Sequence, residues 1–162
     1  MLSRPHIEHI LVPVDLSEGF EPSLSYGVFL ADRFGASVEV LHVVEGSRGI
    51  AMIVPGASAE SDLTLAAERA WRRIDVAVAA LNREGGSKIR VDVRVGGVAT
   101  CILERAQAGD CDLIVMGTHG RRGLQRMLLG SVAEEVIRTA PCPVVTLHLP
   151  GGDVEQPLVA PR

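Results

Sequence analysis

Hydrophobic residues occur along the chain in short runs that alternate with longer segments of helical periodicity. The runs are rich in Val, Ile and Leu and have the length of buried strands, and we predict five strands at 10–14, 38–44, 89–95, 113–116 and 144–147. In between, apolar positions recur at steps of three and four residues. This spacing predicts helices at 18–34, 62–84, 98–108 and 131–140, the first with Ser17 as its N-cap.

The alternation of strands and helices predicts an α/β fold around one parallel sheet. Crossovers between parallel strands are right-handed, so covering both faces with four helices requires the winding to reverse once. A reversal between the first and fourth strands gives a five-stranded sheet in the order 3-2-1-4-5. Ligands bind where the order reverses, at the carboxyl ends of these two strands. Asp15 and Gly117 stand at those ends.

Composition narrows the classes of protein that this chain can belong to. The net charge is −4, and the absence of basic clusters disfavours nucleic acid as a partner. The three cysteines form no CxxC pair, which favours reduced thiols in a cytoplasmic protein. The N-terminus has no apolar signal core and no run is long enough to span a bilayer, so we expect no membrane partner.

The segment 112–140 joins a predicted strand, a glycine-rich loop and a helix N-terminus. Glycines let the backbone approach a phosphate, and the unpaired amides at a helix start attract it. Two familiar phosphate loops are excluded, because the only lysine, Lys88, lies in another segment and no GxGxxG follows the first strand. The pattern present is G-x2-G-x9-G-S, formed by Gly117, Gly120, Gly130 and Ser131.

This pattern resembles the ATP motif of the universal stress protein family, in its nucleotide-binding branch. The strand DLIVMGTHG, the Pro-Val-Asp end of the first strand, LHVV and APCPVV are also similar to that family. The similarity covers about residues 8 to 148, with Val98 in place of a proline often found where the third helix opens. The resemblance implies a fold like the adenine nucleotide alpha hydrolases, with residues 1–148 as the nucleotide-binding domain and 149–162 as a flexible tail.

The resemblance also implies a role for ten residues. Those on the adenosine side are Pro13, Val14, Asp15, Val43, Met116 and Gly117. Those on the phosphate side are Gly120, Gly130, Ser131 and Val132. Asp15 is implied to lie near the ribose, and Val43 to contact adenine through its backbone. Bound ATP would carry Mg²⁺ through its own phosphates, so no protein metal site is implied.

Some of these residues have structural alternatives. Asp15 is also explained as a helix-capping carboxylate, and Ser131 with Glu134 as a capping box, which is compatible with phosphate contact. Three arginines of the loop either screen phosphate charge or are solvated: Arg121, Arg122 and Arg126. His119 is the one tempting general base, but no nucleophile partner is apparent, so we expect at most slow ATP hydrolysis.

The resulting hypothesis is a cytoplasmic ATP-binding stress-response protein that acts as a nucleotide-dependent switch or sensor, with the loop from Glu45 to Ser61 as the element that ATP orders. The last strand, Val144 to Leu147, would be an exposed apolar edge in a monomer, so we predict a homodimer through it, as the family also implies. Two alternatives remain: an adenylyl-transferring or ATP-hydrolysing enzyme on the same scaffold, and an interaction module without nucleotide.

Overall fold

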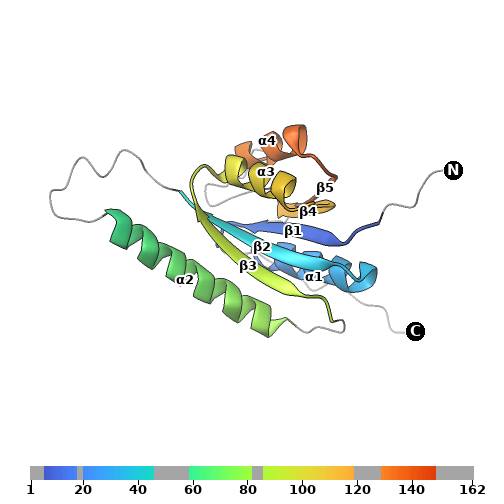
Figure 1. The fold of residues 1–162 in the computed structure, drawn as a ribbon, viewed down its shortest axis with the longest axis horizontal. Coiled ribbons are helices and arrows are strands. Elements are labelled where there is room, and N and C mark those ends of the chain that lie inside the picture. The colour runs from blue at the N-terminus through green and yellow to red at the C-terminus, as the bar shows by residue number, and fades with distance from the viewer. Residues whose placement is uncertain (1–5, 18–19, 46–58, 82–85, 119–128, 149–162) are drawn as a thin grey trace.

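A parallel five-stranded sheet lies between two pairs of helices, with α1 and α2 on one face and α3 and α4 on the other (Figure 1). The computed structural model describes residues 6–17, 20–45, 59–81, 86–118 and 129–148, and within this part the side chains of 59–61 are excepted. The strands are β1 (His9–Val14), β2 (Ser37–Val44), β3 (Ile89–Val95), β4 (Leu113–Gly117) and β5 (Val144–Leu147). The helices are α1 (Glu21–Phe34), α2 (Ala59–Ala80), α3 (Val98–Ala108) and α4 (Ser131–Thr139).

The strand order is β3-β2-β1-β4-β5, and every neighbouring pair is parallel. This confirms the fold class and the order expected from the sequence, with the reversal between β1 and β4. The alternating strand β3 lies at one edge of the sheet, as its one polar face predicts. The short strand β5 forms the other edge, and all four of its residues are only half-buried.

Two helix starts differ from the sequence prediction. Helix α1 begins at Glu21 with Phe20 as its N-cap, so the prediction that Ser17 caps this helix is wrong. Helix α2 begins at Ala59, three residues before the predicted start and inside the segment that we expected to be a loop. The rest of that expected loop, residues 46–58, lies outside the described residues, as does the tail 149–162.

The core forms two layers because the central strands β1, β2 and β4 carry buried side chains on both faces of the sheet. Ile10, Val12 and Val14 of β1 point to the layer under α1 and α2, whereas Leu11 points to the layer under α3 and α4. Helix α1 packs directly on β1, since a β-carbon on Gly27 would lie 2.5 Å from Cγ2 of Val12.

Helix α4 turns a narrower face inward than its sequence predicts. Ala133 and Val136 are buried in the second layer, and Val132 is half-buried beside them. Ile137, which we expected to be on the inward face, is 45% exposed. The nine residues of α4 form a short helix at the margin of the sheet, so only one narrow stripe meets the core.

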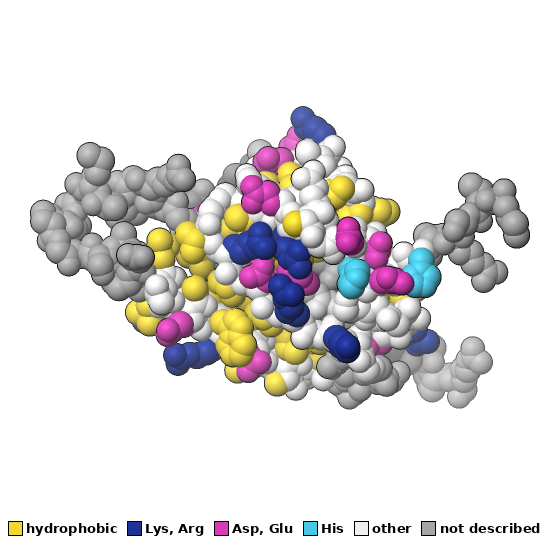
Figure 2. Space-filling view, in the orientation of Figure 1, with side chains coloured by type: hydrophobic (Ala, Val, Ile, Leu, Met, Phe, Trp, Pro, Cys, Tyr) yellow, Lys and Arg dark blue, Asp and Glu magenta, His cyan; other side chains and the backbone are white. Residues whose placement is uncertain are grey.

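On the side of the sheet that carries α3, the face of β2 and β3 bears ion pairs. Figure 2 shows basic and acidic side chains side by side at the centre of this face. Arg94 Nε lies 2.8 Å from Asp92 Oδ2, and the half-buried Arg105 of α3 forms a two-pronged ion pair with Glu39 of β2. The cations of this face are therefore interspersed with carboxylates.

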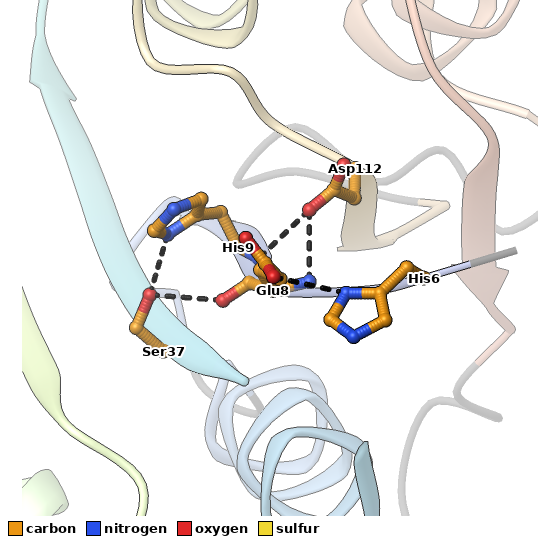
Figure 3. Close-up of polar contacts among 5 residues, drawn as sticks. All are labelled: His6, Glu8, His9, Ser37 and Asp112. Carbon is orange, nitrogen blue, oxygen red and sulfur yellow. Dashed lines mark hydrogen bonds and ion pairs between the residues drawn. The ribbon is translucent and has the colours of Figure 1, made fainter. Parts of the chain in front are cut away.

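A polar network joins the amino ends of β1, β2 and β4 (Figure 3). Asp112 Oδ2, just before β4, accepts hydrogen bonds from the backbone N–H groups of Glu8 (2.8 Å) and His9 (3.0 Å). Ser37 Oγ donates to the carbonyl oxygen of Glu8 (3.1 Å) and lies 2.7 Å from His9 Nδ1. His6 Nδ1 lies 3.1 Å from Glu8 Oε1, and both side chains are exposed. Asp112 is thus the acceptor that holds the start of β1 against β4.

We predict that Asp112→Ala lowers the free energy of unfolding by about 1 kcal/mol, because two backbone donors lose a charged acceptor at a site that water reaches. Asp112→Asn keeps one acceptor oxygen and should lose less. Urea denaturation of both variants and the unchanged chain measures the difference. Equal stability of the three proteins would contradict a structural role for Asp112.

Candidate functional site

Strands β1 and β4 are paired only in their amino-terminal halves. The ladder between them joins Ile10 to Leu113 and Leu11 to Ile114. By contrast, β1 pairs with β2 over its whole length, up to Val14 opposite His42. The carboxyl ends of β1 and β4, residues 14–15 and 117–118, therefore lie beyond their shared ladder. We call this place the switch point, because the winding of the sheet reverses there.

Proline at position 13 explains where the ladder ends. The carbonyl oxygen of His9 accepts from the N–H of Asp112 (3.0 Å), so position 9 faces β4. Backbone groups of alternate residues in a strand face the same neighbour, so position 13 faces β4 as well. Pro13 has no N–H to donate. The sequence showed only that a proline could be accommodated near the strand end, whereas the structure shows that its missing N–H faces the switch point.

Asp15 has one engaged and one unpartnered carboxylate oxygen. Its Oδ1 accepts from the backbone N–H (3.1 Å) and the hydroxyl (2.8 Å) of Ser17. Its Oδ2 is buried and has no hydrogen-bond partner among the described residues. Since α1 begins only at Glu21 and its N-cap is Phe20, the alternative that Asp15 caps this helix is wrong.

The chain turns sharply after Asp15 through a strained residue that sequence reasoning missed. Leu16 has φ 55°, in the left-handed region, although it is not a glycine. Such a conformation costs a leucine about 1 kcal/mol or more. The Leu16 side chain is buried in the core, and its carbonyl oxygen accepts from Arg73 Nη1 of α2 (3.0 Å). Nothing in the sequence identifies a leucine that will adopt this conformation.

Strand β2 supports the end of β1 through His42. The ring is buried, and its Nδ1 donates to the carbonyl oxygen of Val14 (2.8 Å). Because a carbonyl only accepts, this bond places the proton on Nδ1. Val43 follows His42 and so lies one residue beyond the β1–β2 ladder, with its side chain buried in the second layer.

Strand β4 and helix α4 meet at Thr118. The N–H of Thr118 donates to Leu147 of β5 (3.0 Å), and its carbonyl oxygen accepts from the N–H of Gly130 (2.8 Å). This second bond holds the start of α4 at the carboxyl end of β4. Met116, just before, is buried in the second layer, and Gly117 ends the strand opposite Leu147. Thr118 is a positioning residue that sequence reasoning did not single out.

The N-cap residue of α4 has no side chain that could cap the first N–H groups of the helix. Gly130 is the N-cap, so Ser131 is the first helical residue and its hydroxyl does not cap the helix. Glu134 pairs with Arg138 at 2.5 Å instead of reaching back. The capping-box alternative for Ser131 is therefore wrong. Gly130 has φ −75° and ψ 154°, which any residue adopts, so conformation does not require a glycine here.

The structure gathers most of the predicted site in one place. The described predicted residues lie at the carboxyl ends of β1, β2 and β4 or at the start of α4: Pro13, Val14, Asp15, Val43, Met116, Gly117, Gly130, Ser131 and Val132. Gly120, His119 and the three loop arginines lie outside the described residues.

The described part of the chain has other features that were considered as sites. A cavity of about 330 Å³ lies near the amino ends of β1, β2 and β3, away from the switch point, and residues such as Ser37, Lys88 and Arg105 line it. No cluster of three or more His, Cys, Asp or Glu side chains suited to a metal ion occurs among the residues described. None of the helices, as far as they are described, is both long and apolar enough to cross a membrane.

Comparison with solved structures finds the same fold in proteins that bind nucleotides. A universal stress protein of Archaeoglobus fulgidus in complex with dAMP matches with a TM-score of 0.59 at 21% identity, over 88% of this chain and 98% of that one. A universal stress protein in complex with cAMP matches with a TM-score of 0.61 at 20% identity, over 88% and 98%. At this identity the likeness concerns the fold alone.

Sequence comparison is more specific. Universal stress protein MJ0531 of Methanocaldococcus jannaschii is 36% identical over 141 residues, 87% of this chain and 82% of that protein. The solved structure of MJ0577, a universal stress protein of the same organism, matches with a TM-score of 0.77 at 27% identity, over 91% of this chain and 99% of that one. Residues 6–148 match the universal stress protein family model. The chain belongs to the universal stress protein family.

Proposed function

We propose that the chain binds an adenine nucleotide, ATP in particular, at the switch point. The observation that carries this proposal is the buried Oδ2 of Asp15, which has no partner among the described residues, at the same carboxyl-terminal end of the sheet as the start of α4. A buried carboxylate oxygen without a donor is unfavourable, and ribose hydroxyls are donors of the right kind. The first N–H groups of α4 have no acceptor within the helix, and the helix dipole favours phosphate there.

The residues divide between the two halves of such a ligand. Val14, Asp15 and Val43 would face the adenosine, with the strained turn at Leu16 and the hydrogen bond from His42 fixing the end of β1. Gly130 and Ser131 would face the phosphates, and the half-buried Val132 would contribute only its backbone N–H. Mg²⁺ would be held through the phosphates of ATP. The dAMP and cAMP complexes of the two structural neighbours support an adenine ligand.

The proposed role is a nucleotide-dependent switch or sensor in the cytoplasm. Catalysis would be slow ATP hydrolysis at most, because the one tempting base, His119, has no nucleophile partner in the sequence. The free thiols of all three cysteines fit a reducing compartment. We propose neither nucleic acid nor a membrane as a partner. The cations of the β2–β3 face are paired with carboxylates, so this face is not the basic surface that nucleic acid requires.

We also propose that the protein is a homodimer that pairs β5 with its copy across a two-fold axis. The carbonyl oxygens of Pro143 and Leu147 bond to β4, so the odd-numbered positions face that strand. The backbone groups of Val144 and Thr146 consequently face away from the sheet and are available to a second copy.

The nucleotide proposal predicts that Asp15→Asn weakens ATP binding at least tenfold without loss of stability. The amide keeps an oxygen for Ser17 but replaces the unpartnered oxygen with a donor, which cannot accept from a ribose hydroxyl. Titration calorimetry gives the affinity and thermal unfolding gives the stability, with Asp62→Asn on the exposed side of α2 as a matched control. A destabilised protein with unchanged affinity would indicate a purely structural Asp15.

Gly130→Asp should abolish ATP binding, because a side chain and a negative charge would meet the phosphates. The fold should be retained, since the backbone of Gly130 suits any residue and aspartate is a favoured N-cap. Mass spectrometry of nucleotide released from the purified proteins, together with a Gly130→Ser control, measures the effect. Unchanged ATP affinity in Gly130→Asp would refute the phosphate assignment.

The dimer proposal predicts that Thr146→Pro raises the dimer dissociation constant at least tenfold. The substitution removes an N–H that faces away from β4 and leaves the ladder with β4 intact. Thr146→Ala keeps the N–H and should remain dimeric. Sedimentation equilibrium distinguishes the two, and a monomer at micromolar concentration in the unchanged chain would overturn the proposal.

A further inference from the structure

Two cysteines lie close together at the amino ends of β4 and β5, which is the end of the sheet opposite the switch point. Cys111 lies just before β4 and Cys142 just before β5, and both are half-buried. Their Sγ atoms are 3.7 Å apart, with the thiol of Cys142 donating to the sulfur of Cys111. The thiol of Cys111 in turn contacts the carbonyl oxygen of Leu113 (3.2 Å). We call these two residues the cysteine pair.

The backbone already holds the cysteine pair in place. Ile114 pairs with Val144 at the start of the β4–β5 ladder, and the N–H of Ile114 donates to the carbonyl oxygen of Pro143 (3.0 Å). Asp112, next to Cys111, is bonded to the start of β1. A disulfide needs the sulfurs closer by only about 1.6 Å, a distance that side-chain rotation can supply. Neither strand has to leave its register.

We propose that the cysteine pair is a redox modification site, at which Cys111 and Cys142 form a reversible intramolecular disulfide when the protein meets a peroxide. The thiolate of one cysteine attacks a peroxide oxygen, which forms a sulfenic acid and releases hydroxide that takes up a proton as water. The second thiol then attacks the sulfenic sulfur and releases another water. In total, the two thiols lose two electrons and hydrogen peroxide is reduced to two waters. A dithiol reductant reverses the change.

The contacts assign the order of attack. Burial, first of all, and the neighbouring Cys111 and Asp112 together raise the pKa of Cys142 to about 12. Burial also raises the pKa of Cys111, but the hydrogen bond from Cys142 opposes that rise. Cys111 is therefore the sulfur that attacks peroxide, and Cys142 resolves the sulfenic acid. Asp112 and, from α3, Arg105 are the charged groups that act on Cys111.

The raised pKa values make the site slow at neutral pH. A thiolate is the reacting form, so its fraction grows as pH rises toward the pKa, and the rate of disulfide formation grows with it. The site therefore accumulates oxidation under sustained exposure to peroxide. The bond would enclose β4, α4 and the segment that joins them in one covalent loop, closed by two cysteines that are 31 positions apart in the sequence.

The test exposes the whole protein to hydrogen peroxide and counts its free thiols, with mass spectrometry of unreduced peptides. We expect the count to fall from three to one, with a peptide that joins Cys111 to Cys142 and is lighter by two hydrogen atoms. The rate should rise with pH. The oxidised protein should unfold about 5–10 °C higher than the reduced one, because the cross-link restricts the unfolded chain.

Matched variants separate this site from general oxidation. Cys101→Ser should still form the disulfide, because Cys101 is buried in α3 and is not one of the two cysteines that are in contact. Cys111→Ser and Cys142→Ser should each lose it. Three outcomes would overturn the proposal: retention of all three thiols, oxidation of single cysteines to sulfinic acid, or a disulfide that links two chains. ATP affinity is measured separately, and its loss or retention leaves this inference unaffected.

Discussion

A backbone hydrogen bond that cannot form organises this molecule. The middle strand β1 gives hydrogen bonds to β2 along its whole length, but toward β4 its ladder stops at Leu11. Pro13 faces β4 without an N–H, so the two strands end apart from each other at the place where the sheet reverses its winding. The residues proposed to bind nucleotide surround this place, and they are held there by contacts that do not depend on a β1–β4 ladder.

Those contacts come from three directions. His42 of β2 fixes the carbonyl oxygen of Val14, α2 holds the strained turn at Leu16 through Arg73, and Thr118 holds the start of α4 through Gly130. Together they maintain, at one end of the sheet, the start of α4 and a carboxylate whose buried oxygen has no partner among the described residues. Such an arrangement is unfavourable in isolation, and a ligand with hydroxyl donors and an anionic group would satisfy both halves.

Strand β4 connects two sites of different chemistry. Its carboxyl end belongs to the switch point, and its amino end carries Cys111 beside Cys142. The polar network of Asp112 ties that amino end to β1, so the same strand is anchored at both ends. A universal stress protein with a nucleotide site and a separate thiol pair would respond to nucleotide and to peroxide independently, at the two ends of one strand.

The sequence by itself determined the strands and the sheet order, because buried parallel strands leave strong apolar runs and few topologies satisfy right-handed crossovers. It did not determine the start of α1 at Glu21 or the N-cap of α4 at Gly130, because a capping residue fits several adjacent positions and the choice depends on what each side chain meets. The left-handed Leu16 and the contact between Cys111 and Cys142 were decided only by the tertiary structure, since both depend on packing between segments distant in sequence.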